Sequence, residues 1–394
     1  METLLDRSRF DRLIGYLAHD PSNLPLLQDA SHEAMQLGLW REAHELLDRT
    51  LALSPTDAPS RYRMSVALMM EHDPIASLEY SQALIDEGVD APAVLYQHAR
   101  ALILAGRHAE AEPLFERLAP HASELPEFAL LHIRALHGAG KLDEAAALAA
   151  TMEADPIAQG MLSLIRIDND DLEAGAALAR EVLAHDPDNV DALLASATAA
   201  VAMEDAEAAL PQFERVAALH ADSGRAWMGI ALARLSAGDI AGGREAFEKT
   251  VRLLPGHLGS WNALAWVQMM QNDLDAAQET LEAAMRQDRN FGETHGTLAV
   301  LLASRGQWDE ARHETDIALR LQPESFAGRF AQTLIIEHRG RPQLSQQMLR
   351  QIMENFHAPA GGNMIDVVRR YAARRKPALS SAVPAAHSSQ KETR

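Results

Sequence analysis

The hexapeptide Gly38-Leu-Trp-Arg-Glu-Ala43 is the first clear copy of a short motif that recurs along the chain. Strong copies begin at Gly106, Gly140 and Gly306, and weaker copies begin at Gly238, Asn272 and Gly340. With the faintest copies included, the starts are 38, 72, 106, 140, 170, 204, 238, 272, 306 and 340. Every interval is 34 residues except the one from 140 to 170, which is 30. Spacing this regular indicates a tandem repeat.

Prolines mark a second break in the repeat. Pro21, Pro55, Pro187, Pro255 and Pro323 lie 17 residues after a motif start, or where a preceding motif would place them. Proline cannot continue a helix, and the Gly or Asn of the motif suits the backbone at a helix C-terminus. Two breaks in each repeat predict two helices of about 13 residues.

The apolar residues between the breaks follow helical spacing. In the repeat that starts at Gly224, Trp227, Ile230 and Ala231 occupy positions 4, 7 and 8. This spacing places them on one helix face. Small residues at positions 8 and 20 would let the two helices approach closely.

The whole pattern resembles the tetratricopeptide repeat family over about residues 24–357. The ten copies start at 24, 58, 92, 126, 156, 190, 224, 258, 292 and 326. The resemblance implies an all-α, right-handed superhelical solenoid of antiparallel helix pairs, and we expect a bacterial source. Gln159 at the bulky position of the fifth copy and Arg289 at the terminal proline of the eighth depart from the pattern, so we expect lower local stability there.

Five segments follow from the pattern. We expect an N-terminal capping helix in 1–23, repeats one to four in 24–155 and repeats five to ten in 156–357. A C-terminal capping helix in 358–376 and a disordered tail in 377–394 complete the chain, because terminal repeats need a cover with a polar outer side.

The short interval from 140 to 170 predicts an irregularity in the stacking. Pro156 follows Gly140 by 16 residues, so we expect the missing length after Pro156. One hypothesis is a kink near residues 153–160 that divides the solenoid into two arms. The alternative is that a shorter helix is absorbed without a bend.

Composition restricts the compartment and the partners. The chain has no cysteine, and we expect neither a signal peptide nor a membrane span, so the cytoplasm is the expected location. The formal net charge is −20, the sum of −25 on residues 1–361 and +5 on residues 362–394, and this acidic body disfavours nucleic acid. The basic cluster Arg369, Arg370, Arg374, Arg375 and Lys376 either offsets a helix dipole or contacts an anionic partner.

The resemblance also implies a concave groove lined by the first helix of each pair, at positions 2, 5, 6, 9, 12 and 13. The candidate groove residues are Tyr62, Met69, Met70, Tyr96, Arg100, Arg134, Met161, Met228, Asn262, Trp266, Met269, Met270 and Phe330. Methionine suits an adaptable binding surface. The alternative is that these side chains pack between neighbouring first helices. The family's Lys and Asn carboxylate clamp and its Asn ladder are both missing.

No sequence motif of an enzyme is present. The chain lacks His-Glu-x-x-His, G-x-G-x-x-G, a P-loop and G-x-S-x-G, so we expect no catalysis, no cofactor, no metal and no small-molecule substrate. The sequence predicts a scaffold or adaptor that binds partner proteins in an apolar groove. The alternative is a chaperone-like holder of a single client in secretion, pilus or surface-polysaccharide assembly. A regulatory subunit of a separate enzyme is a third hypothesis.

Overall fold

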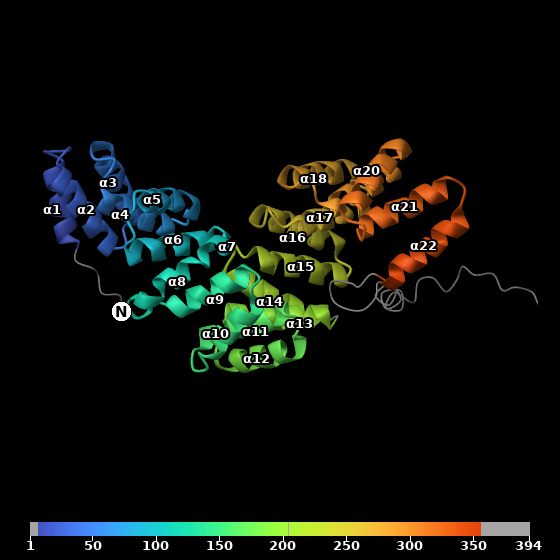
Figure 1. The fold of residues 1–394 in the computed structure, drawn as a ribbon, viewed down its shortest axis with the longest axis horizontal. Helices are drawn as coiled ribbons and strands as arrows, with labels where there is room; N and C mark the ends of the chain where they lie inside the picture. Colours follow the sequence, from blue (N-terminus) through green and yellow to red (C-terminus); the bar gives the residue numbers. More distant parts are fainter. Residues whose placement is uncertain (1–6, 204, 356–394) are drawn as a thin grey trace, which may run out of the picture. The chain divides into compact units, whose positions relative to one another are not determined.

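Helices form all of the regular secondary structure in the residues that the computed structural model describes, which are 7–203 and 205–355. The predicted fold class, an all-α solenoid of antiparallel helix pairs, is confirmed (Figure 1). The chain divides into two compact units, unit 1 ending at Leu178 and unit 2 beginning at Ala179. The predicted division into arms at 155/156 stays a prediction.

Unit 1 contains the first helix pairs. Its helices are α1 (Ser8–Leu17), α2 (Leu24–Gln36), α3 (Trp40–Leu53), α4 (Ala58–Met70), α5 (Pro74–Asp86), α6 (Pro92–Leu104), α7 (His108–Ala111), α8 (Leu114–Leu118), α9 (Phe128–Gly138), α10 (Leu142–Ala150) and α11 (Pro156–Asp168). A 3-10 helix, η1 (Ala119–Glu124), lies between α8 and α9, and α12 (Leu172–His185) begins in unit 1 and ends in unit 2.

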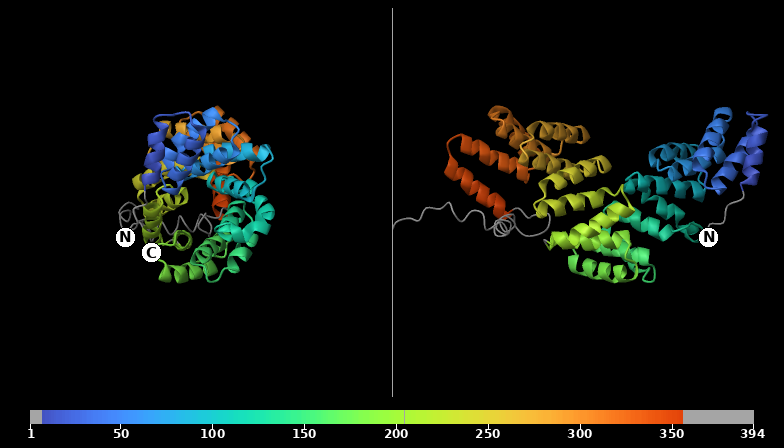
Figure 2. Two further views of the ribbon diagram at one scale, coloured as in Figure 1. Left: turned by 90° about the vertical axis from the view of Figure 1, so that its left-hand side faces the viewer. Right: turned by 180° about the vertical axis from the view of Figure 1, so that it is seen from behind.

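Unit 2 continues with regular pairs, which Figure 2 shows from two further sides. Its helices are α13 (Val190–Ala202), α14 (Ala206–Leu219), α15 (Gly224–Ser236), α16 (Ile240–Leu253), α17 (Leu258–Met270), α18 (Leu274–Gln287), α19 (Gly292–Ser304), α20 (Trp308–Leu321), α21 (Phe326–His338) and α22 (Pro342–Asn355). Nine of the ten predicted repeat starts coincide with the first residue of a helix, and the fourth, predicted at 126, begins at Phe128.

The first residue of the recurring motif adopts a left-handed backbone in every copy that the structure describes. These residues are Gly38, His72, Gly106, Gly140, Asp170, Gly238, Asn272, Gly306 and Gly340, with φ between 60° and 85°. At the first turn the N–H of Gly38 donates to the carbonyl of Met35 at 3.1 Å, and the N–H of Leu39 reaches back to the carbonyl of Ala34 at 2.9 Å. This pair of bonds closes a helix C-terminus. The prediction that the motif ends the first helix is confirmed.

The residue at position 8 of each repeat is almost completely buried in the core. These residues are Ser31, Ser65, Ala99, Ile133, Ser163, Ala197, Ala231, Ala265, Ala299 and Thr333, and none is more than 2% exposed. Eight of the ten are Ser or Ala, which allows the second helix of the pair to approach closely.

A recurring hydrogen bond ties the start of a repeat to the end of the one before. The residue at position 4 donates a side-chain N–H to the backbone carbonyl six residues earlier. The pairs are Arg61–Pro55, Trp227–Ala221, Trp261–Pro255, His295–Arg289 and Arg329–Pro323, at 2.6 to 2.9 Å. Gln159 donates instead to Met152, seven residues earlier, at 3.2 Å.

The third repeat differs from the prediction of two helices of about 13 residues. Its second half consists of two short helices, α7 and α8, followed by the 3-10 turn η1. Pro113 falls between α7 and α8, and Pro120 falls in η1. Proline lacks the N–H that helix continuation needs and its ring clashes with the preceding turn, so the helix breaks there.

The prediction that the missing length lies after Pro156 is wrong. Helix α11 has 13 residues, whereas α10 has only 9, so the four missing residues belong to the second helix of the fourth repeat. Pro156 stands at the first turn of α11, where proline is favoured, and the Asp155 side chain caps that helix. Ile133, Ala149 and Ile165 form one core across α9, α10 and α11.

The N-terminal helix α1 packs on the first repeat. Phe10 and Leu17 are 4% and 3% exposed, and they share a core with Leu27 and Ala34 of α2. The predicted C-terminal capping helix and the predicted disordered tail lie outside the described residues.

Candidate functional site

The structure separates the predicted groove residues by exposure. Arg134, Met70 and Met270 are exposed; Tyr62, Arg100, Met228, Trp266, Met269 and Phe330 are half-buried; Met69, Tyr96, Met161 and Asn262 are buried. The last four are at most 9% exposed, so they pack beneath the surface and present little area to a partner. Met161, for example, belongs to the core between α9, α10 and α11.

An apolar surface lies across the first helices of the last three repeats. We call it the unit 2 patch and define it by the half-buried Trp266, Met269, Phe330 and Leu334, the buried Val300 of α19 on which they pack, and the exposed Met270, one turn after Trp266 on α17. The Trp266 and Phe330 rings are 5.9 Å apart and tilted by 53°, a favourable aromatic geometry. Met270 is 66% exposed at the end of α17. The patch therefore combines a supported aromatic centre with a flexible, solvent-exposed edge.

Gly296 explains how Trp266 reaches a ring two repeats further along. A Cβ at this position in α19 would lie 2.3 Å from the backbone nitrogen of Gly328 in α21. The two helix backbones therefore touch at this point. This close approach brings Phe330 within contact of Trp266 across α19.

Two members of the unit 2 patch were missed by the sequence analysis. Val300 and Leu334 occupy position 9 of the ninth and tenth repeats, the same position that Trp266 holds in the eighth. Position 9 is apolar in four consecutive repeats (Leu232, Trp266, Val300 and Leu334), and this run is the sequence signal for both residues.

Asn262 has a structural role beside the patch. Its Nδ2 donates to the carbonyl of Leu258 at 2.9 Å and to the hydroxyl of Thr294 at 3.0 Å. The second bond joins α17 to α19. Asn262 therefore aligns two of the three helices that carry the patch.

A second group of predicted residues lies in unit 1. The buried Tyr96 donates its hydroxyl to the carbonyl of Pro126. Burial raises the pKa of Tyr96 and of Tyr62, and the Arg100 guanidinium opposes that shift at both phenols. Arg100 follows Tyr96 by one turn of α6, and Tyr62 is on α4.

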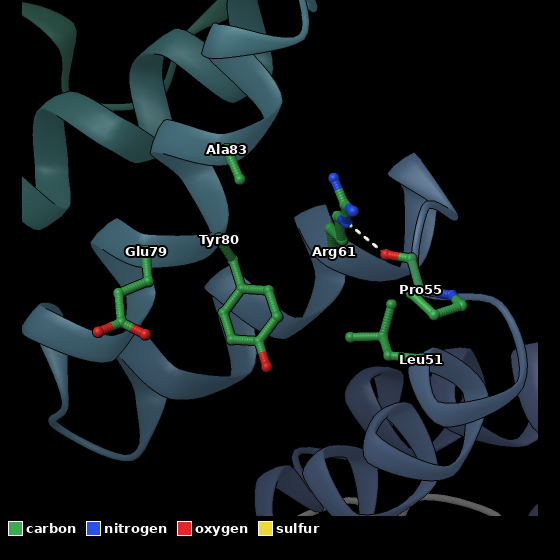
Figure 3. A pocket seen from close by; sticks show the side chains of 6 residues that line it. All are labelled: Leu51, Pro55, Arg61, Glu79, Tyr80 and Ala83. Atoms are coloured by element: carbon green, nitrogen blue, oxygen red, sulfur yellow. Dashed lines mark hydrogen bonds between the residues drawn. The ribbon is translucent and has the colours of Figure 1, made fainter.

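A cavity at the surface of unit 1 lies away from the groove positions. It has a volume of about 340 Å³ and is lined by Leu51, Pro55, Arg61, Glu79, Tyr80 and Ala83, as Figure 3 shows. Arg61 is already engaged there, because it donates to the carbonyl of Pro55 and to Glu87, the latter at 2.7 Å. None of its lining residues belongs to the candidate groove residues predicted from the sequence.

Two histidines with shifted pKa values are held by hydrogen bonds within the fold. In His295 the Nδ1 atom lies 2.6 Å from Glu314, and this hydrogen bond raises the pKa of His295. Burial lowers the pKa of His98, whose Nδ1 lies 2.9 Å from the Ser81 hydroxyl. Within the described residues, no three His, Asp or Glu side chains gather as a metal site would require, and no helix is both long and apolar enough to cross a membrane.

Comparisons with known proteins agree with this architecture. Two tetratricopeptide repeat families match the sequence, one over residues 194–257 and the other over residues 234–294. No curated protein matches it.

Several solved structures are similar. One is the crystal structure of the APC/C hetero-tetramer Cut9-Hcn1, with a TM-score of 0.59 and 13% identity over 92% of this chain and 81% of that chain. MamA from Desulfovibrio magneticus RS-1 is 20% identical over 41% of this chain and 94% of its own, with a TM-score of 0.34. YrrB, described as a TPR protein with an unusual peptide-binding site, is 16% identical over 48% and 97%, with a TM-score of 0.39. At this identity, the first of these shows a shared fold.

Proposed function

From the premise that this chain is a tetratricopeptide-repeat protein, we propose that it is a non-catalytic scaffold for protein interactions. The unit 2 patch binds an apolar segment of a partner protein. This proposal follows from one observation: Met270 is 66% exposed one helical turn after Trp266, whose ring packs against Phe330, and the half-buried Met269 and Leu334 beside that pair are apolar too. Apolar area is costly to leave in water, so a partner that covers it gains free energy.

Trp266 is the expected anchor of the interaction. Buried aromatic residues at the centre of an interface are typical hot spots, and truncating one costs about 2 kcal/mol of binding free energy. The flexible Met270 and Met269 side chains would adapt to the partner's surface around this anchor.

The test is co-purification of partners with the intact chain. Met270→Glu places a charge on the exposed edge of the patch. Met203→Glu is the matched control, because Met203 is 79% exposed and lies in unit 2 outside the patch. We expect M270E to lose the bound partner while M203E retains it. Retention by M270E, or equal loss from both variants, would contradict the proposal.

A chaperone-like holder of one client remains the second candidate function. The methionine side chains of the patch favour it, since they suit the binding of varied apolar sequences. A holder binds one short segment of a single client, whereas a scaffold binds two separable partners. Catalytic inactivity, a cytoplasmic location and the absence of nucleic-acid partners stay predictions from the sequence.

A further inference from the structure

Two histidines lie between the second half of the third repeat and α9. His108 begins α7 and packs on Gly138 at the end of α9, because a Cβ on Gly138 would lie 2.2 Å from the His108 Cγ and 2.4 Å from its Nδ1. His132 of α9 stacks on Phe115 of α8, with the ring centroids 4.6 Å apart and the ring planes 5° from parallel. These two contacts hold α7 and α8 against α9.

The Nδ1 atom of His108 is buried and has no hydrogen-bond partner among the described residues. A neutral imidazole can keep an unprotonated nitrogen at this position, whereas an imidazolium carries an N–H on both nitrogens. Protonation would therefore bury a charged donor without an acceptor, which is more costly than burying a neutral nitrogen. Burial lowers the pKa of His108, and the neighbouring His137 lowers it further.

The other charged and titratable groups around His108 are bonded elsewhere. The pairs are His98–Ser81 from α6, Arg107–Glu110 and Lys141–Glu112 around α7, Arg117–Asp90 from α8, His121–Glu124 from η1 and His137–Asp168 from α9, at 2.6 to 3.8 Å. Burial lowers the pKa of His132 as well; the Glu112 and Glu144 carboxylates oppose this shift, and Lys141 adds to it. Within the described residues, none of these groups forms a hydrogen bond with His108.

The segment that carries His108 lacks the support of one continuous helix. Residues 108–124 form α7, α8 and η1, of four, five and six residues. Helical pieces this short depend on packing for their stability. Just beyond them, Glu127 adopts a φ of 52°, a left-handed backbone that strains a residue with a Cβ. We call residues 108–124 the His108 segment, and its contacts with α9 are its main support.

We propose that the His108 segment is an acid-sensitive element of unit 1, which detaches from α9 when His108 is protonated. Detachment places the imidazolium in water and exposes Phe115 and Leu118, which are 1% and 0% exposed in the closed form. The pKa of His108 is lower in the closed form than in the open form, so the closed form is fully stable above the ordinary His pKa and loses stability as the pH falls below it. This element lies in unit 1 and is independent of the apolar site proposed for unit 2.

The experiment is hydrogen exchange of the intact chain, measured by mass spectrometry at pH 7.5 and pH 5.5 and corrected for the intrinsic pH dependence of amide exchange. At one pH unit below the ordinary His pKa of about 6.5, a histidine that is protonated only in the open form increases opening about tenfold. We expect the amides of the His108 segment to lose protection by about this factor at pH 5.5, while α17 and α18 of unit 2 keep theirs. Equal protection of the His108 segment at both pH values, or an equal loss in α17 and α18, would overturn the proposal.

Two variants test whether His108 is the responsible group. His108→Leu removes the titrating ring and keeps an apolar side chain against α9, so the loss of protection at pH 5.5 should disappear. Gly138→Ala displaces the ring, since the added Cβ would lie within 2.4 Å of three ring atoms. The displaced imidazole then titrates in water, and protection of the His108 segment should again be the same at both pH values. A tenfold loss that persists in either variant would overturn the proposal.

His121→Leu is the matched control. His121 lies in the same segment, on η1, but 41% of its side chain is exposed. Its imidazolium is already in contact with water in the closed form, so this variant should keep the wild-type loss of protection at pH 5.5. If the loss disappears in H121L, acid acts through another group of the segment and the proposal fails. The Met270 variants test the unit 2 patch separately, so either proposal can fail while the other stands.

Discussion

Replacing Gly296 with Ala tests the contact that brings the unit 2 patch together. The added Cβ would lie 2.3 Å from the nitrogen and 2.9 Å from the Cα of Gly328, and 2.8 Å from the carbonyl carbon of Ala327. All three are backbone atoms, so no side-chain rotation relieves the clash. Carbon atoms prefer separations of about 3.5–4.0 Å, and α19 and α21 must therefore move apart by roughly 1 Å.

The expected cost combines two opposing effects. Overpacking a close contact costs about 1–3 kcal/mol, and backbone atoms on both sides place this case at the upper end. Alanine recovers about 1 kcal/mol because it is the better helix former. We therefore expect G296A to lower the free energy of unfolding by about 2 kcal/mol and to move Phe330 away from Trp266.

The assay is urea unfolding followed by circular dichroism at 222 nm and by tryptophan fluorescence. Gly15→Ala is the matched control, because Gly15 lies within α1 and its Cβ would meet nothing within 4 Å. That variant should gain about 0.5–1 kcal/mol from helix propensity alone. If G296A is as stable as wild type or gains stability like G15A, the inferred backbone contact is wrong.

Four further substitutions test local features. Residues 72 and 106 both have a positive φ, which glycine adopts more easily than histidine. His72→Gly should therefore raise the free energy of unfolding by about 1 kcal/mol, and Gly106→His should lower it by a similar amount. Thermal melting of the two variants measures both changes. The hydrogen bond to Glu314 raises the pKa of His295. The stability that this pair adds is therefore complete below the ordinary His pKa and is lost as the pH rises through the pKa of His295 in the folded protein. Glu314→Gln should lower the free energy of unfolding by about 1 kcal/mol near pH 6 and by less near pH 8, measured by urea titration at each pH. Asp155→Ala should cost about 1 kcal/mol, since its carboxylate accepts two N–H bonds at the start of α11, and an equally stable variant would contradict this.

The repeat architecture was predictable because it depends on local chemistry. Residues at the motif starts set the helix C-termini, and even His72 and Asp170 adopt a left-handed backbone there. The prediction of where the short repeat loses its residues failed at a proline, because proline occurs both after a helix end and in the first turn of a helix. Pro156 was interpreted as a helix end, yet proline is also favoured in the first turn of a helix. Pro113 breaks the third repeat, whereas Pro211 lies inside α14 without ending it.

The candidate site was only partly predictable. Position within the repeat identified Trp266 and Phe330, but their contact depends on how closely α19 and α21 approach at Gly296. That distance is a tertiary property and leaves no periodic signal. Burial of Met161 likewise depends on packing between three helices.

Photo-crosslinking from the unit 2 patch tests the central claim most directly. Benzoylphenylalanine at position 270 would sample whatever covers the patch in the native cell, and the same group at position 203 samples an exposed site outside it. We predict a crosslink to a discrete partner protein from position 270 and none to that protein from position 203. No crosslink from position 270, or the same products from both positions, would contradict the account.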